Sequence, residues 1–147
     1  IRLHILYSMI LINKETTNTI ALTLTEKSQL LGYDNGGNLT GTTYNLFVFE
    51  NEGRDEEKIF TANDISPYKE RYNEFEVLES GTTENLLGGI IHLTGRTSQW
   101  SYKIYESDTA FSADTLAVSA TTGTILEQGR VLVRGNEGDT SINDVYL

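Results

Sequence analysis

The chain has no cysteine, a single proline and only two histidines among its 147 residues. Without cysteine there can be no disulfide, no zinc–thiolate centre and no cysteine nucleophile. No run approaches the roughly 18 apolar residues of a membrane-spanning helix, so the sequence predicts none. Basic residues are also few, with 11 Lys and Arg against 21 Asp and Glu, a net charge of −10. That charge repels phosphate and anionic lipid, so we expect no nucleic-acid or membrane partner.

The length suits one domain, which we expect to span residues 9–135. Residues 1–8 are an extension of doubtful origin. Met9 favours a natural start within the sequence, and a signal peptide is the alternative for the segment before it. Residues 136–147 are polar, and we expect them to form an edge strand or an arm that reaches a neighbouring subunit.

Apolar and polar side chains alternate in residues 19–25, 74–77 and 98–105, which is typical of half-buried strands. The alternation predicts a buried set and an exposed set. The buried set is Leu22, Phe75, Trp100, Tyr102 and Ile104, and the exposed set is Thr23, Glu74, Glu76 and Lys103. Thr25 has the same outward phase as Thr23. Because a shift of one residue would exchange the two sets, burial tests the pattern directly.

Three further segments predict strands. Residues 44–49 are apolar on both faces, which indicates a central strand or one covered by a loop or a partner. Residues 129–134 and 86–94 each have one apolar face, and Gly88-Gly89 in the latter indicates a bulge or bend. The inward residues of these two segments are Val131, Val133, Ile91 and Leu93.

Turn signals separate these segments. Residues 51–55 predict a hairpin loop, and Ser66 followed by Pro67 predicts one helical turn that carries the chain from one sheet to another. Residues 31–43 and 107–123 are longer loops of small polar residues. About eight short strands with turns between them predict an all-β fold, an antiparallel two-sheet β-sandwich of the immunoglobulin-like or Greek-key type.

Candidate catalytic residues are few. His92 lies between Ile91 and Leu93 on the face away from the expected core, where a histidine is more often a surface residue than a base or a ligand. His4 lies in the doubtful extension. Glu74 and Glu76 share one strand face, where glutamates more often guard an edge against pairing than act as acid and base.

The sequence signals for a ligand-binding loop are equally weak. Residues 34–38 offer oxygen ligands for calcium but lack the spacing and the terminal glutamate of an EF-hand loop, so we expect a plain turn. The acidic run at 55–57 has the same interpretation. Residues 36–41 lack the Lys-Ser/Thr ending of a phosphate loop. We therefore expect that the protein is not an enzyme and that it has no catalytic residue, no metal ligand and no cofactor.

Two features leave room for a binding surface. Arg130 and Arg134, near Lys103, are the only basic residues expected to form a small patch. Trp100 is in phase with buried residues, so a core position is favoured over sugar stacking. An exposed aromatic platform would have to come from other residues, and the candidates are Tyr33, Tyr44, Tyr105 and Tyr146.

Several segments carry a resemblance to a known family. They are residues 9–14, 19–27, 44–50, 57–60, 68–75, 100–106 and 129–135. Their order resembles a family of small proteins encoded by tailed phages of Bacteroidetes, including the crAss-like phages. The resemblance covers most of residues 9–135 and is strongest at 68–75 and 100–106. Two departures are a longer loop at 31–43 and the absence of a counterpart to residues 1–8.

The resemblance implies a structural, non-enzymatic component of the virion, either capsid-associated or a head–tail accessory protein, assembled in the host cytoplasm. Its expected partners are other virion proteins, or further copies of the chain joined through an edge strand or the C-terminal arm. No site residues come with the resemblance. A carbohydrate- or receptor-binding β-sandwich module is the alternative. Location in the particle, oligomeric state and strand topology stay open at this point.

Overall fold

The computed structural model describes residues 8–51, 53–94 and 98–135. Within these residues the chain is mostly β-strand. Its helical segments are two single 3-10 turns, η1 (Thr25–Lys27) and η2 (Val118–Ala120). No helix in this part of the chain has the length and apolar character needed to cross a membrane. The prediction of an all-β fold is confirmed.

The strands differ widely in length. They are β1 (Ser8–Asn13), β2 (Thr17–Leu22), β3 (Gly32–Tyr33), β4 (Leu39–Thr40), β5 (Tyr44–Asn51), β6 (Glu56–Thr61), β7 (Asn73–Glu79), β8 (Ile90–Ile91), β9 (Ser98–Ser107) and β10 (Ile125–Arg134). Seven of them have six residues or more, and β3, β4 and β8 have two each.

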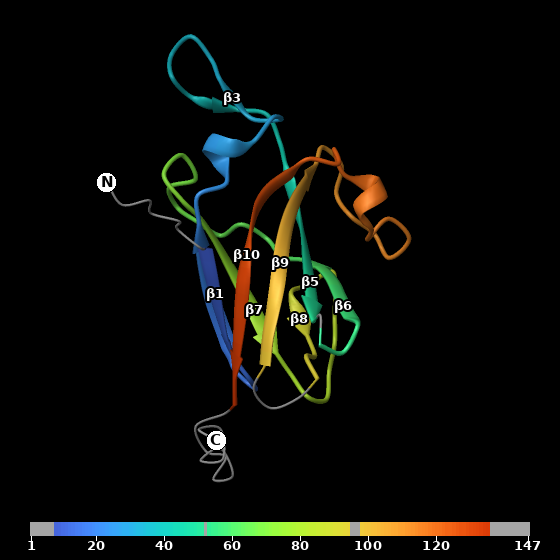
Figure 1. Cartoon of the computed structure of the whole chain (residues 1–147). Helices are drawn as coiled ribbons and strands as arrows, with labels where there is room; N and C mark the ends of the chain where they lie inside the picture. Colours follow the sequence, from blue (N-terminus) through green and yellow to red (C-terminus); the bar gives the residue numbers. More distant parts are fainter. Residues whose placement is uncertain (1–7, 52, 95–97, 136–147) are drawn as a thin grey trace, which may run out of the picture.

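Five strands form the larger sheet, in the order β1-β10-β9-β5-β6, and three form the smaller sheet, in the order β2-β7-β8 (Figure 1). β3 and β4 pair as a small hairpin that projects from one end. Most neighbours are antiparallel, but β1 runs parallel to β10 and β8 runs parallel to β7. The expectation of antiparallel sheets is wrong at these two pairs, because side-chain alternation is the same in both kinds of pairing.

One hydrophobic cluster contains residues of both sheets. The larger sheet contributes Ile10, Ile12, Phe47, Phe49, Phe60, Trp100, Tyr102, Ile104, Val131 and Val133, and the smaller sheet contributes Ile20, Leu22, Phe75, Val77 and Ile91. All five side chains predicted to be buried belong to this cluster. Of those predicted to be exposed, Thr23 and Glu76 are exposed, and Glu74 and Lys103 are partly exposed. The strand registers follow the period-two pattern.

Aromatic rings connect the sheets at the centre of the cluster. Phe47 on β5 stacks on Phe60 on β6, with 5.1 Å between ring centroids. It also meets Phe75 on β7 edge to face, with 5.0 Å between centroids. Because Phe75 comes from the other sheet, this contact holds the two sheets together at van der Waals distance.

A smaller cluster lies on the opposite face of the larger sheet. Leu46, Val48 and Tyr105 are buried there under the loop that follows β9. The loop contributes Phe111, Leu116 and Val118, and Ile59 of β6 adds to the cluster. β5 is thus apolar on both faces because a loop covers its outer face, which is one of the two expected arrangements.

Some local expectations need correction. Thr25 is buried, because η1 turns its hydroxyl inward to donate to the Lys69 carbonyl at 2.6 Å. Of residues 86–94 only Ile90–Ile91 form a strand, although Ile91 and Leu93 are in the core as predicted. Ser66 does cap the following segment through Oγ, which accepts the Tyr68 N–H at 3.0 Å, but a turn forms there instead of a regular helix.

The two predicted terminal segments lie mostly or wholly outside the described residues. β1 begins at Ser8, so the expected extension at 1–8 falls outside the described residues except for its last member. The expected arm at 136–147 lies wholly outside them. The turn at Ser66 carries the chain from β6 of the larger sheet to β7 of the smaller sheet, as predicted.

Truncating Phe75 to alanine should lower the free energy of unfolding by about 3–5 kcal/mol, because a cavity opens where the two sheets meet. Urea denaturation of the purified domain measures the change. Tyr68→Ala is the control, since Tyr68 is 60% exposed and should lose well under that amount. Equal losses for the two variants would show that the sheets are not joined through this aromatic contact.

Candidate functional site

A concave surface lies on the outer face of the larger sheet. It is a hollow of about 590 Å³, and we call it the outer hollow. β9 and β10 form its floor, and the end of β5 with the following turn forms one side. The lining residues are Glu50, Gly53, Gln99, Trp100, Ser101, Tyr102, Lys103, Gln128, Gly129 and Arg130.

Strand register explains why polar groups gather there. On β9 the outward residues Gln99, Ser101 and Lys103 alternate with the buried Trp100 and Tyr102. Antiparallel pairing with β10 then sets Gln128 opposite Lys103 and Arg130 opposite Ser101. Two strands that each bury one face therefore present amides, a hydroxyl and cations on the other.

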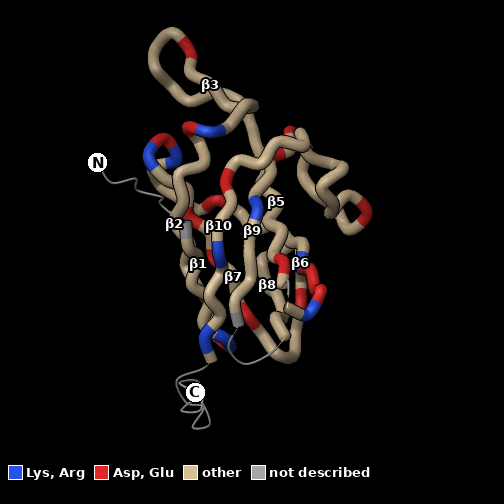
Figure 2. Tube along the Cα trace, viewed as in Figure 1, with Lys and Arg blue, Asp and Glu red and all other residues tan. Residues whose placement is uncertain are grey.

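The charge of this face differs from that of the whole chain. Over β1, β10 and β9 the outward side chains include Lys103, Arg130 and Arg134 and no carboxylate within the described residues. The first carboxylate is Glu50 on β5, whose Oε1 lies 3.6 Å from Lys103 Nζ. Figure 2 shows the basic residues along β10 and β9. Such a face suits anionic or hydroxyl-rich groups.

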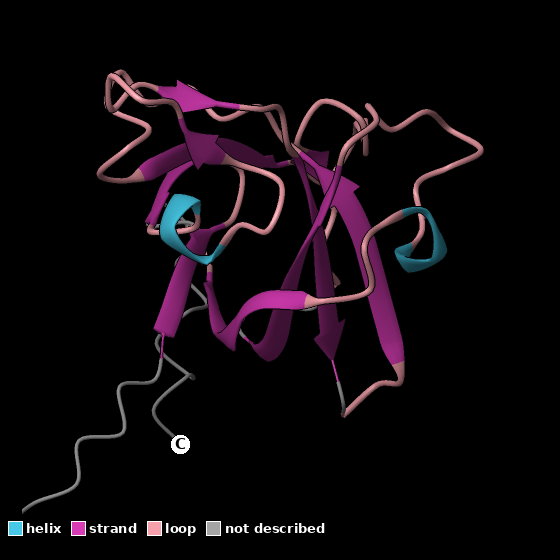
Figure 3. Cartoon of the chain, turned by 90° about the horizontal axis from the view of Figure 1, so that it is seen from above, coloured by secondary structure: helices cyan, strands magenta, loops and turns pink. Residues whose placement is uncertain are grey.

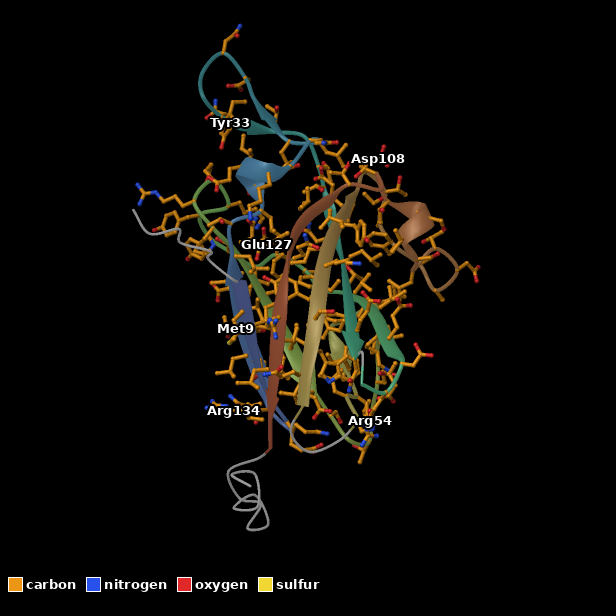
Figure 4. The ribbon with its side chains drawn as sticks, viewed as in Figure 1. Met9, Tyr33, Arg54, Asp108, Glu127 and Arg134 are labelled. Carbon is orange, nitrogen blue, oxygen red and sulfur yellow. The ribbon has the colours of Figure 1, made fainter. Side chains whose placement is uncertain are left out.

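The predicted basic patch is therefore only partly assembled. Arg130 and Lys103 both line the outer hollow. Arg134 lies four residues further along β10, where its Nε donates to Asn13 Oδ1 at 3.1 Å. Met9 and Arg134 are on the same flank of the molecule (Figure 4).

Three glutamates that were not predicted from the sequence are buried in the described part of the chain. They are Glu79, Glu106 and Glu127. Glu79 and Glu106 continue the inward phase of their strands, after Phe75 and Val77 and after Tyr102 and Ile104. That phase was the signal that could have identified them.

Glu106 closes the base of the projecting hairpin. Its Oε1 accepts the hydroxyls of Ser28 at 2.6 Å and Thr43 at 2.8 Å, and its Oε2 accepts the Gln29 N–H at 2.7 Å. These residues lie just before β3 and just after β4, so one buried carboxylate holds both ends of this loop. Seen from above, the two 3-10 turns of the chain lie on opposite sides (Figure 3).

Glu79 holds the turn between β1 and β2 against the end of β8. Its Oε1 accepts the Glu15 N–H at 3.0 Å, and its Oε2 accepts the Leu93 N–H at 2.9 Å. Lys14 Nζ lies 3.9 Å from Oε2. Here too the carboxylate binds backbone groups from two other segments.

Glu127 connects η1 to β10 and β9. Its Oε1 lies 2.8 Å from Lys27 Nζ, and its Oε2 accepts the Tyr102 hydroxyl at 2.6 Å. Tyr102 is thus a core aromatic whose polar end has a charged partner.

His92 does lie beside a carboxylate, although it follows β8 and is not in mid-strand. Its Nδ1 is 3.1 Å from the Ser80 carbonyl oxygen and 3.5 Å from Glu79 Oε2, and its side chain is 44% exposed. Both Glu79 oxygens already accept backbone N–H groups, so the pair is suited to holding loops. His92 does not line the outer hollow.

Glu84 stabilises the segment around His92 from the protein surface. Burial acts to raise the pKa of this carboxyl, but the hydrogen bonds from Lys58 Nζ at 2.7 Å and from the His92 N–H at 3.0 Å outweigh it. The pKa of Glu84 is therefore held below its ordinary value.

The other candidates are dispersed. Asp34 forms a turn in which its Oδ1 accepts the N–H groups of Gly36 and Asn38, each at 2.9 Å, as the turn interpretation predicts. The Asn38 N–H bond is the main reason why the pKa of Asp34 is lowered. Glu74 and Glu76 lie two residues apart on β7, and none of the described hollows is lined by both. Within residues 8–51, 53–94 and 98–135 no three metal-binding side chains converge.

The proposed tyrosine platform is also divided. Tyr33 is exposed at the projecting hairpin and Tyr44 is exposed at the start of β5, whereas Tyr105 is buried under the outer loop. Figure 4 labels Tyr33 at the end of the molecule from which the β3–β4 hairpin projects. Tyr146 and His4 lie outside the described residues.

Replacing Glu106 by glutamine should loosen the projecting hairpin, because the amide cannot accept all three hydrogen bonds. We expect a loss of about 1–3 kcal/mol in the free energy of unfolding. Hydrogen exchange should also become faster at residues 28–43. The control is Glu57→Gln on the exposed part of β6. Unchanged exchange in the hairpin would contradict the anchoring role of Glu106.

No protein-family model, curated protein or solved structure matches the chain. Its function is therefore inferred from the outer hollow, the buried carboxylates and the strand edges.

Proposed function

We propose that the chain is a non-enzymatic structural component of a tailed-phage virion, either capsid-associated or a head–tail accessory protein. In this proposal its two sheets form an immunoglobulin-like, Greek-key β-sandwich, and the shared hydrophobic core lies between them. The protein assembles in the host cytoplasm and resides in the particle. Its partners are other virion proteins.

The observation that carries the proposal is the use made of the buried carboxylates. Glu79 and Glu106 each bind groups from two other segments, and Glu127 joins η1 to the larger sheet. Buried carboxylates with these partners hold the loops at fixed positions on a rigid frame of strands. A rigid frame with fixed loops suits a protein whose work is to hold neighbours.

The strand edges support a role in assembly. β6 and β1 are the edges of the larger sheet, and edge strands present backbone groups to neighbouring chains. β6 carries Glu56, Glu57 and Lys58, charges that oppose pairing, whereas β1 carries none. The absence of charge on β1, in a chain of net charge −10, supports pairing with a neighbouring chain at this edge.

Mass spectrometry of purified particles tests the proposal. We expect the chain in stoichiometric ratio to the major capsid or tail proteins after density-gradient purification. A phage protein made in the same infected cells but not packaged serves as the control for contamination. Absence from particles, or an amount no higher than that control, would overturn the virion assignment.

A carbohydrate- or receptor-binding module is the second candidate, and the outer hollow is the observation that favours it. Its Gln99, Ser101 and Gln128 supply donors and acceptors, and its Lys103 and Arg130 supply positive charge. Groups of these kinds bind sugar hydroxyls and carboxylates. The occupant that fits best is an acidic glycan.

Glycan-array binding decides this second candidate. The wild-type protein should bind sugars that carry carboxylates, and the variant Lys103→Gln/Arg130→Gln should lose most of that signal because the charged contacts are removed. Arg54→Gln, outside the hollow, is the matched control and should bind as the wild type does. No binding by the wild type would remove this candidate and leave the virion role untouched.

A further inference from the structure

Both sheets end at the same corner of the chain. β1 is the edge of the larger sheet and β2 is the edge of the smaller one, and the short turn at residues 14–16 joins them. At that end the Asn18 side chain bridges the two strands. Its Oδ1 accepts the Asn13 N–H at 2.8 Å, and its Nδ2 donates to the Asn13 carbonyl at 3.0 Å. The corner is therefore closed at the end near Asn13.

Backbone direction shows which groups of β1 face the corner. The Lys14 N–H bonds the Arg134 carbonyl on β10, whereas the groups of Asn13 point the other way, to Asn18. Backbone groups alternate in direction along a strand. The N–H and C=O groups of Met9 and Leu11 therefore face away from β10, and within the described residues they have no hydrogen-bond partner.

The corner opens toward the other end of β1. A hollow of about 310 Å³ lies there, and we call it the corner hollow. Its lining residues are Met9, Ala21, Leu22, Thr23, Tyr72 and Glu127. The Met9 and Leu11 side chains are 59% and 40% exposed. The edge thus combines unbonded backbone groups, exposed apolar side chains and space beside them.

The chain carries a segment of matching chemistry. Residues 136–147 contain three carboxylates, Glu137, Asp139 and Asp144, and no Lys or Arg. Their apolar members are Ile142, Val145, Tyr146 and Leu147. On the docking side, Arg130 and Arg134 face outward on β10 beside Met9 and Asn13. These arginines lie one strand behind the edge, so their charge attracts an acidic segment to it, and the apolar residues of the segment would meet Met9 and Leu11.

We propose that residues 142–147 of one copy bind as an added strand to the free edge of β1 in a second copy. The six residues equal β1 in number. Added strands gain backbone hydrogen bonds at the edge and specificity from alternate side chains. The inference deepens the proposed assembly role, and rests on it, by naming the partner as another copy of the chain.

The path of the chain favours a second copy over the chain's own edge. Arg134, the last residue of β10, pairs with Asn13, so the C-terminal segment departs at the end of β1 that Asn18 closes. The corner hollow lies at the Met9 end of β1, opposite to the end at which Asn13 pairs with Arg134. To reach its own edge the segment would have to pass around the turn at 14–16.

Sedimentation of the full chain over a wide concentration range tests the proposal. We expect reversible association to dimers or larger closed assemblies, weaker at high salt because charges contribute. Deleting residues 136–147 should abolish association and leave the melting temperature of the monomer nearly unchanged. Leu11→Lys should weaken association at least about tenfold, since a charge on the edge opposes pairing. Leu87→Lys is the matched control, because Leu87 is 41% exposed and lies on a loop.

Mixing two defective variants identifies the occupant. The deletion variant keeps the β1 edge and lacks the segment, whereas Leu11→Lys keeps the segment and has a blocked edge. Together they should form a mixed complex that neither forms alone. Unchanged association of the deletion variant would show that another segment occupies the edge and would overturn the proposal.

Two further outcomes are decisive. A deletion variant that is less stable but sediments like the wild type would place the segment on its own chain and also overturn the proposal. A wild type that stays monomeric at every concentration would do the same. Particle mass spectrometry is independent of these results, so failure of self-association is distinguishable from failure of the virion role.

Discussion

The contact between Phe47 and Phe75 is the constraint on which the rest of the structure depends. It sets the ring of one sheet against the ring of the other, 5.0 Å apart, and Phe60 stacks behind it. With the sheets fixed at this point, β9 must bury Trp100 and Tyr102 and must present Gln99, Ser101 and Lys103 outward. The outer hollow is thus a consequence of how the core is packed.

Buried carboxylates extend this order from the core to the loops. Glu106 fixes both ends of the projecting hairpin, and Glu79 fixes the turn between β1 and β2. Buried charge is costly unless hydrogen bonds satisfy it, and each of these carboxylates is satisfied by groups from distant parts of the sequence. The cost of burying them is balanced only when those segments are in place, so the loops and the sheets form together.

The molecule offers two surfaces of different character. The outer hollow is polar and lies on a sheet face, where amides and cations suit a small acidic or hydroxylated ligand. The corner beside β1 is an edge, where the backbone of Met9 and Leu11 suits an extended chain. Arg130 lies between them, since it lines the outer hollow and pairs in register with Met9. A ligand at one surface therefore lies next to a partner at the other.

The sequence alone determined the all-β class, the register of β2, β7 and β9, and the cores around Phe75 and Trp100, because alternation along a strand is a local property. It also indicated the turns at residues 51–55 and at Ser66. Only the tertiary structure decided that β1 runs parallel to β10 and that β1, which has no charged residue, is an edge of the larger sheet. It also decided that Glu106 anchors a hairpin 63 to 78 residues away in sequence. Strand order and the partners of a buried carboxylate depend on which distant segments meet in space. Side-chain alternation contains no information about that choice.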